Sequence, residues 1–385
     1  MDFNINAEQR AFVELAQQFA SHELAPNAAQ WDAQAEWPLA ALKQAGELGF
    51  CGLYANPEWG GLGLSRLDSS LIFEHLAMGC TTTTAMLTIH NMVTWMVTAF
   101  ANQQTCAKYG EKLTSGEYLA SYCLTEPNAG SDAASLTTKA VKDGSDYLLT
   151  GSKIFISGAG ETDVLVVMAR TGGPGAGGIS ALLVDANSEG ISFGRKEDKM
   201  GWNAQPTRMI TFDQVRVPGN QLLGQEGEGF ALAMQGLDGG RINIATCSLG
   251  TAQQALQDAL NYVNERKQFG KPIAAFQGLQ FKLADMNTQL VAARQMVRLA
   301  AFKLDQKDAD ATTYCAMAKR FVTDVCYEIC DEALQCFGGN GYIKEYPMER
   351  YVRDSRVHRI LEGTNEIMRV IIARRILQAG SQIIV

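Results

Sequence analysis

The stretch Tyr147-Leu148-Leu149-Thr150-Gly151-Ser152-Lys153-Ile154-Phe155-Ile156-Ser157 lies within a middle segment of β character that begins at about residue 117. It holds two short β-rich runs, Tyr147–Thr150 and Ile154–Ser157, joined through a glycine. Similar runs follow at regular spacing, with Gly, Asp and Pro between them, at Val164–Ala169, Ile179–Val184, Met209–Phe212 and Val215–Val217. Short, evenly spaced strands of this kind predict a small antiparallel barrel or sandwich.

Helical periodicity precedes and follows this β segment. Near the N-terminus, Asn6 and Gln9 form a capping pair for a helix that Pro26 should end. Helical stretches follow at Leu39–Leu48 and Ser69–Phe100, and longer ones at Arg241–Arg266, Phe276–Gln306, Asp310–Gln335 and Thr364–Leu377. We therefore expect an α+β multidomain chain, with a helical domain over 1–116, a β domain over 117–222 and a helical bundle over 223–385.

One glycine-rich stretch invites two interpretations. Gly172–Gly178 contains five glycines and resembles a phosphate-binding loop. A nucleotide loop should open a helix, however, and the residues that follow, Ile179–Val184, have the pattern of a strand. A mobile hairpin connection is the better interpretation.

Composition narrows the class of protein. The apolar share is 46% and the charged share 19%, as in a folded globule with a large core. A net charge of −8 argues against a nucleic-acid partner, which requires a concentrated basic face. The most apolar stretch, Ala85–Phe100, includes His90, Asn91 and threonines, which suit a buried helix better than a membrane span.

The cysteines and the N-terminal residues indicate in which cellular compartment the protein is expected. Nine cysteines lack the spacing of a disulfide scaffold or a zinc site, so we expect buried thiols in a reducing compartment and no metal. The N-terminal residues show no secretory signal. The expected location is the cytoplasm of a bacterium, or the mitochondrial matrix for a processed eukaryotic chain.

Four motifs are candidates for chemistry, and each has an ordinary alternative. Tyr122–Asp132 joins a short strand to a polar turn that either binds a ligand or lies on the surface. Phe155-Ile156-Ser157 either faces a planar cofactor or belongs to the core.

The third motif combines Arg266-Lys267-Gln268-Phe269-Gly270, Phe276-Gln277 and Gln335–Tyr342. Arginine can pair with pyrophosphate, although glycines also simply end helices. The fourth is Leu361–Glu366, where Thr364 is a plausible N-cap and Glu362 is either a base or a solvated charge.

Taken together, the four motifs resemble the acyl-CoA dehydrogenase family over nearly the whole chain. The resemblance rests on a loop of the form TEPxAGSD, then Arg-x-x-Phe-Gly, Gln-x-x-Gly-Gly-x-Gly-Tyr, and Glu-Gly-Thr before a helix. It implies that an N-terminal helical domain, a middle β domain and a C-terminal four-helix bundle enclose FAD, usually within a homotetramer. It also implies an acyl-CoA thioester substrate and an electron-transferring flavoprotein as electron acceptor.

The resemblance assigns roles residue by residue, with Glu362 as the catalytic base. The implied FAD contacts are Tyr122, Leu124, Thr125, Gly130, Ser131, Phe155, Ile156, Ser157, Arg266, Phe269, Phe276, Gln277, Gln335, Cys336, Phe337, Gly338, Gly339, Thr364, Asn365 and Glu366. Those between Arg266 and Gly339 would reach FAD across a subunit interface. The implied substrate contacts are Ser131, Asp238, Gly239, Gly240, Arg241, Gly363 and Arg374.

Two departures from the family pattern matter. Many relatives carry tryptophan and threonine where this chain has Phe155 and Ser157, so flavin stacking differs. One branch of the family places its base near Gly240, which here cannot act as one. That leaves Glu362 to take an α-proton while the β-hydrogen leaves as hydride.

The stretches Gly151–Gly160 and Leu237–Arg241 are most similar to the isobutyryl-CoA branch of the family, which implies a short branched acyl-CoA. Open alternatives are a straight short-chain (butyryl) or 2-methylbutyryl substrate, an oxidase-like flavoenzyme, and a non-catalytic CoA-ester binding scaffold.

Overall fold

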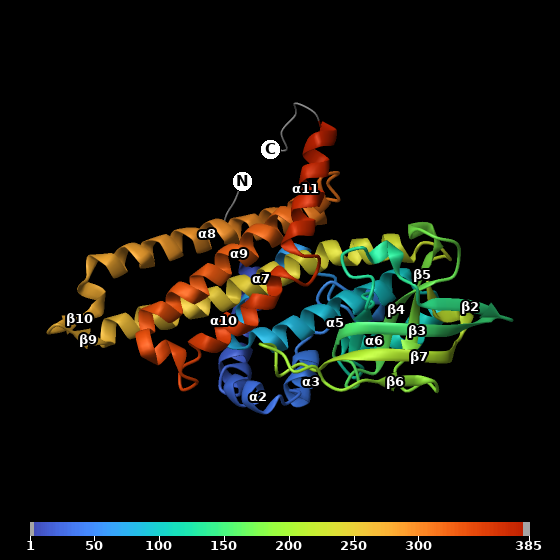
Figure 1. The fold of residues 1–385 in the computed structure, drawn as a ribbon, viewed down its shortest axis with the longest axis horizontal. Coiled ribbons are helices and arrows are strands. Elements are labelled where there is room, and N and C mark those ends of the chain that lie inside the picture. Colours follow the sequence, from blue (N-terminus) through green and yellow to red (C-terminus); the bar gives the residue numbers. More distant parts are fainter. Residues whose placement is uncertain (1–3, 380–385) are drawn as a thin grey trace.

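The computed structural model describes residues 4–379. Along the sequence a β domain separates two helical regions, and in space its sheet lies at one end of the molecule with the long C-terminal helices extending away from it (Figure 1). The N-terminal helices are α1 (Ala7–Phe19), α2 (Ala28–Gln34), α3 (Leu39–Glu47), α4 (Arg66–Gly79), α5 (Thr81–Phe100) and α6 (Gln103–Thr114). The predicted capping pair of α1 is confirmed, because the side chain of Asn6 accepts from the Gln9 N–H at 2.8 Å and the side chain of Gln9 accepts from the Asn6 N–H at 3.0 Å. A π-helical turn, Ala20–Leu24, carries the pattern on towards Pro26.

The single helix predicted over Ser69–Phe100 is wrong. The backbone is extended at Cys80 (φ −154°, ψ 109°), which divides the stretch into α4 and α5. The apolar pattern continues through the break because both helices are largely buried. Periodicity therefore gave no sign of the interruption.

The β domain is one eight-stranded sheet. Its strands are β1 (Ala120–Cys123), β2 (Lys139–Asp143), β3 (Asp146–Ser157), β4 (Val164–Arg170), β5 (Ile179–Asp185), β6 (Ile191–Phe193), β7 (Thr207–Val217) and β8 (Leu222–Leu223). The order is β6-β7-β3-β2-β4-β5-β8, with β1 paired to β4. The first two predicted runs form one strand, β3, and the last two form β7. The glycine-rich stretch connects the antiparallel pair β4 and β5, so the predicted hairpin connection is confirmed.

The predicted antiparallel barrel is wrong in two respects. The sheet is open, ending at β6 and β8, and β4 pairs in parallel with both β1 and β2. Helices explain the open form, since alternate residues of β4 such as Val166 pack with Met92 of α5 and Ala233 of α7. The other residues of β4, such as Val167, pack with β3 and β7. One face of the sheet is thus covered by the helical domains, and closure is not needed to bury it.

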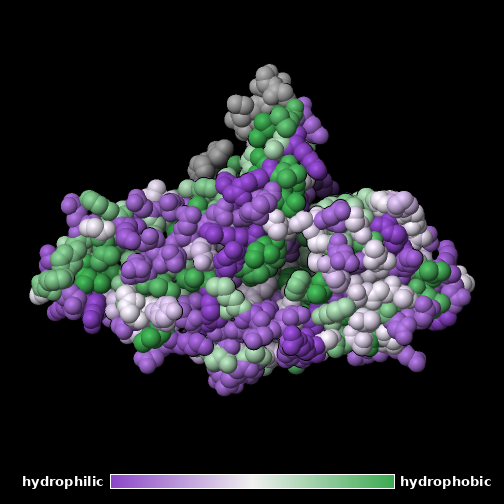
Figure 2. Space-filling view, in the orientation of Figure 1, coloured by the Kyte–Doolittle hydropathy of each residue, from purple (hydrophilic) through white to green (hydrophobic). Residues whose placement is uncertain are grey.

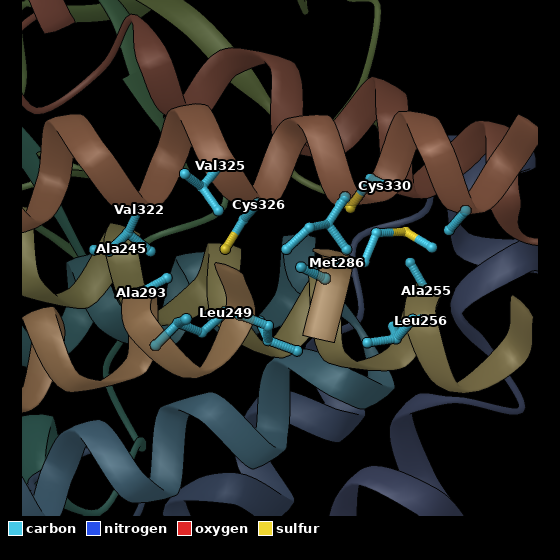
Figure 3. Packing of buried hydrophobic residues seen from close by; sticks show 14 of the residues in the cluster. Ala245, Leu249, Ala255, Leu256, Met286, Ala293, Val322, Val325, Cys326 and Cys330 are labelled. Carbon is cyan, nitrogen blue, oxygen red and sulfur yellow. The ribbon is translucent and has the colours of Figure 1, made fainter. Parts of the chain in front are cut away.

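The C-terminal region contains α7 (Gly229–Glu265), α8 (Gln277–Asp305), α9 (Ala311–Phe337), α10 (Met348–Arg356) and α11 (Asn365–Ala379). Helices α7, α8 and α9 share a core that includes Leu249, Met286, Val322 and Cys326 (Figure 3). The fourth long helix, α11, packs on α9 but projects away from the bundle (Figure 1). A short ribbon of β9 (Lys267–Gln268) and β10 (Lys271–Pro272) marks the far end of the bundle.

Candidate active site

A cavity of about 410 Å³ lies where the β domain meets the two helical regions. Its walls come from α5, from β1 and the turn that follows it, from β3, from α7 and from α11. The loop that joins α10 to α11 supplies Leu361, Glu362 and Gly363. Segments more than 200 residues apart in sequence therefore meet in one site.

Glu362 directs its carboxylate into this cavity, against α7. A Cβ atom placed on Gly240 would lie 2.4 Å from Glu362 Oε2, so the missing side chain of Gly240 makes room for the carboxylate. The Oε2 atom is inaccessible to solvent and has no hydrogen-bond partner among the described residues. Burial raises the pKa of Glu362 to about 7, although the charges of Arg241 and Lys319 oppose the rise. A carboxylate with this pKa suits proton abstraction near neutral pH.

Two consecutive residues with a left-handed backbone conformation shape the loop at Glu362. Its φ is +57° and that of Gly363 is +87°. A positive φ is uncommon for a residue with a Cβ atom, so the surrounding structure must hold it in place. Thr364 then accepts a hydrogen bond from the Ile367 N–H at 3.3 Å, which confirms it as the N-cap of α11.

Replacing Gly240 by alanine tests this steric fit. The added methyl group would meet the carboxylate at 2.4 Å and displace it, and a displacement of about 1 Å can cost about 100-fold in rate. We expect Gly240→Ala to slow reduction of the cofactor by acyl-CoA by about that factor, measured by stopped-flow absorbance. Gly177→Ala, in the connection between β4 and β5, is the control, because a Cβ there meets no atom within 4 Å. Equal rates for the two variants would contradict the fit.

A second wall of the cavity contains the candidate FAD contacts of the first two motifs. Phe155 has a positive φ of +58° and leaves 63% of its surface exposed, so its ring is uncovered at the cavity. An exposed aromatic ring among polar turn atoms fits a planar, partly polar ring system such as a flavin. The residues of this set that line the cavity are Tyr122, Leu124, Thr125, Gly130, Ser131, Phe155, Ile156 and Ser157.

A buried ion pair holds the turn after β1. Lys153 of β3 is fully buried, and its Nζ donates to Glu126 Oε1 at 2.8 Å and to the Leu124 carbonyl at 3.0 Å. The same carboxylate accepts from the N–H groups of Thr137 and Thr138. Burial opposes ionisation of Glu126, but Lys153 and these hydrogen bonds outweigh it and lower its pKa to about 2. Burial lowers the pKa of Lys153, and Glu126 opposes that change, so each member of the pair favours the charged form of the other; the pair fixes the turn to the sheet.

The candidate substrate contacts divide into two groups. Ser131, Gly240, Arg241, Gly363 and Arg374 line the cavity. Asp238 and Gly239 lie behind it, where Asp238 accepts from Arg241 Nη1 and from Thr312 Oγ1, each at 2.6 Å. Within one chain, Asp238 thus orients Arg241.

The candidates of the third motif lie apart from the cavity, at the end of the bundle near β9 and β10 (Figure 1). Phe269 is 91% exposed and contacts Phe276 edge-on at 5.8 Å. The set consists of Arg266, Phe269, Phe276, Gln277, Gln335, Cys336, Phe337, Gly338 and Gly339. One chain does not bring these residues to the cavity, so any role in the same site requires a second chain.

Glu366 at the start of α11 is exposed, whereas Asn365 is buried. The Asn365 amide donates to Thr323 Oγ1 at 3.0 Å and to Asp324 Oδ1 at 2.9 Å, and its oxygen accepts from Lys319. Within the chain, Asn365 therefore anchors the loop to α9.

Several residues that line the cavity were not predicted from the sequence as site residues. They are largely apolar: Ala85, Thr88, Ile89, Met92, Trp202, Phe230, Met234, Leu237 and Ile244. Core and pocket positions share one apolar pattern, so periodicity offered no signal to separate them. Lys319 was also missed, because a lysine within a helical stretch is normally on the surface.

Across residues 4–379, no helix is both long enough and apolar enough to cross a membrane. Nor do three or more His, Cys, Asp or Glu side chains of these residues gather in a geometry suited to a metal ion.

The fold and the site together define a flavin-dependent oxidoreductase of the acyl-CoA dehydrogenase class. Family models for the N-terminal, middle and C-terminal domains of acyl-CoA dehydrogenase match residues 6–117, 121–215 and 227–377. The chain belongs to the acyl-CoA dehydrogenase family, whose enzymes depend on FAD.

Three known proteins illustrate the relationship. Mitochondrial isobutyryl-CoA dehydrogenase of Bos taurus is 52% identical, with 97% of this chain and 90% of the relative covered. Butyryl-CoA dehydrogenase from Megasphaera elsdenii has a solved structure that is 38% identical with a TM-score of 0.95, covering 98% of this chain and all of the other. A chain from a solved structure described as the electron transferring flavoprotein of Acidaminococcus fermentans is 40% identical with a TM-score of 0.96, again covering 98% and 100%.

Proposed function

We propose that the chain dehydrogenates a short branched acyl-CoA such as isobutyryl-CoA to the 2-enoyl-CoA, with Glu362 as the catalytic base. The observation that carries this proposal is the carboxylate of Glu362, which lies in the cavity with a buried, unpartnered oxygen and a pKa raised to about 7. The 52% identity to an isobutyryl-CoA dehydrogenase supports the branched substrate.

The reaction breaks two C–H bonds, one at the α-carbon and one at the β-carbon, and each hydrogen goes to a different acceptor. The Glu362 carboxylate takes the α-proton, the electron pair of that bond forms the α,β double bond, and the β-hydrogen leaves with its electrons. FAD, when bound, supplies the acceptor for that hydride. Among the described residues, the Glu362 backbone N–H donates to no backbone carbonyl, which leaves it available to a thioester oxygen. Such a donor contributes about 3 kcal/mol to stabilising the developing oxyanion.

Tyr122, Leu124, Thr125, Gly130, Ser131, Phe155, Ile156 and Ser157 would hold FAD from the sheet side. On the helical side, Ala85, Ile89, Met92 and Ile244 would contact the acyl group through apolar surface. Arg241 and Arg374 would face the CoA ester. Thr364 and Glu366, which the family resemblance also assigns to FAD, lie at the start of α11 beside the cavity.

The substrate assignment is tested with a series of thioesters. The cavity wall is apolar around Glu362, and one methylene changes selectivity by about 1–3 kcal/mol, or about 10–200-fold. Anaerobic cofactor bleaching should be fastest with isobutyryl-CoA, slower with 2-methylbutyryl-CoA, and slowest with butyryl- and isovaleryl-CoA. Equal or faster bleaching with butyryl-CoA would remove the branched assignment. Peroxide release measured in the same samples would reveal an oxidase instead.

A homotetramer is part of this proposal. One face of α8 exposes four large apolar side chains, Phe281, Val291, Leu299 and Phe302. Apolar surface also covers the end of the bundle at β9 and β10 (Figure 2). Exposed apolar patches of this kind mark interfaces, and association here would bring the third motif of one chain to the cavity of another. Analytical ultracentrifugation giving four times 41.8 kDa is the expected result.

The acceptor and the compartment complete the proposal. We expect an electron-transferring flavoprotein to reoxidise the cofactor, in keeping with the family resemblance and the matching chain from Acidaminococcus fermentans. All nine cysteines are buried free thiols, which suits the bacterial cytoplasm or the mitochondrial matrix. Reoxidation rates with and without a purified electron-transferring flavoprotein would test the acceptor.

A further inference from the structure

Lys319 of α9 is a buried lysine beneath the loop that carries Glu362. Its side chain has no exposed surface, and lysine is rarely buried unless it is paired. The Nζ atom donates to the Gly363 carbonyl at 2.7 Å and to Asn365 Oδ1 at 2.8 Å. Both acceptors follow Glu362 within three residues, so the ammonium group contacts the loop and not a surface carboxylate.

We propose that Lys319 is a positioning residue for Glu362: its buried ammonium group anchors the catalytic loop and supplies positive charge beneath the carboxylate. The inference rests on the proposed role of Glu362 as the base. It adds a residue that none of the four sequence motifs contains.

The anchor explains how the loop keeps its strained backbone. Glu362 and Gly363 both have positive φ, and a non-glycine residue in this region costs about 1–3 kcal/mol unless its surroundings hold it. Lys319 binds the carbonyl of Gly363, the second of these residues. Asn365 extends the connection, because its amide also bonds to Thr323 and Asp324 of the same helix. Helix α9 therefore fixes the loop at two neighbouring positions.

The charge matters because no hydrogen bond compensates Glu362 Oε2. Burial lowers the pKa of Lys319 to about 7, and the nearby carboxylate of Glu362 opposes that change. Burial raises the pKa of Glu362, and Lys319 opposes that change in turn. Each group thus favours the charged form of the other.

Other ionisable groups also face this pair and stay in place when Lys319 is replaced. Arg241 on α7 acts on both members, and Tyr54 and Tyr122 face Glu362 from the N-terminal domain and from β1. Asp324 on α9, Glu366 on α11 and the neutral, buried His358 face Lys319. The positive charge of Arg241 is the reason that Glu362 should still ionise without Lys319.

The test is Lys319→Met, which keeps the length of the side chain and removes its charge and hydrogen bonds. The base must be deprotonated, so the rate of cofactor reduction rises with pH through the pKa of Glu362. Loss of a neighbouring cation should move that midpoint upward by about one unit, which lowers the rate about tenfold on the acidic side. Hydrogen–deuterium exchange of residues 361–366, measured without substrate, should become faster because the anchor is lost.

Two further variants separate the anchor from the charge. Asn365→Leu removes one acceptor of Lys319 and the hydrogen bonds from the Asn365 amide to α9, but it retains the lysine itself. Hydrogen–deuterium exchange of the loop should therefore become faster without an upward shift of the pH midpoint. Lys112→Met on α6 makes the same change of charge at an exposed ion pair, whose other member is Glu117, and should alter neither measurement. The proposal would be overturned if Lys319→Met kept the native pH midpoint of cofactor reduction and the native hydrogen–deuterium exchange of residues 361–366. A lower rate of cofactor reduction with both of these unchanged would overturn it as well. The exchange result does not depend on which acyl-CoA is the substrate, so failure of the substrate assignment remains distinguishable.

Discussion

Glu362→Gln is expected to retain FAD and bind acyl-CoA but to lose reduction of the cofactor by substrate, by about 10⁴-fold. The amide has nearly the shape of the carboxylate, so it fits the space beside Gly240, but it cannot accept the α-proton. Stopped-flow absorbance under anaerobic conditions measures the loss, and the spectral change on adding acyl-CoA shows that binding persists. Glu328→Gln, an exposed carboxylate on α9, is the control and should behave as the native enzyme. Normal bleaching by Glu362→Gln would show that another group is the base.

The same group sets two dependences on pH. In the native enzyme, the reduction rate should rise as pH passes through about 7, where Glu362 loses its proton. Stability should change in the opposite direction. A carboxyl group whose pKa is higher in the folded state favours folding below its unfolded pKa, and this contribution is lost as pH rises through the folded value. Glu362→Gln should therefore raise the unfolding temperature at pH 8 relative to the native protein and not at pH 4.

Lys153→Met is expected to destabilise the fold by about 3–5 kcal/mol, the usual cost of leaving one member of a buried ion pair without its partner. The remaining Glu126 carboxylate is 5% exposed and would keep only its bonds to Thr137 and Thr138. Because Glu126 lies in the turn after β1, FAD should also dissociate more readily. Urea unfolding at pH 7 and the amount of FAD retained on gel filtration measure the two effects.

A matched control exists on the same sheet. Lys142 pairs with Glu226 at 3.2 Å, but its side chain is 64% exposed, and solvent screens such pairs. Lys142→Met should change stability little, and the double variant Lys153→Met with Glu126→Gln should recover part of the loss. Equal stability of the two lysine variants would show that the Lys153–Glu126 pair does not hold the turn.

Much of the fold followed from local sequence. The long helices α7, α8 and α9 were predicted because strong helix formers with few prolines cover those stretches, although the prediction began α7 twelve residues late. The strands β3, β4, β5 and β7 were predicted from β-rich runs between turn residues. β2 was missed because Lys139-Ala140-Val141-Lys142-Asp143 has few strand-forming residues, and pairing with β3 determines its conformation.

Two features of the fold depend on contacts between elements and could not be predicted from sequence. Whether the sheet closes depends on the helices that cover β4 and β5, and the course of α11 depends on its packing against α9. A pattern of apolar residues shows that a face is buried but not what buries it.

The order and spacing of the four motifs were enough to indicate the family and to single out Glu362, because the motifs are built from short continuous stretches of residues. The placement of Gly240 against the carboxylate, of Lys319 beneath the loop and of Trp202 in the cavity wall became evident only in three dimensions. These three residues come from α7, from α9 and from the loop before β7, and no local signal links them. The charge state of a carboxyl group depends on how much solvent its neighbours remove and on which charges they bring near, and folding alone assembles those neighbours.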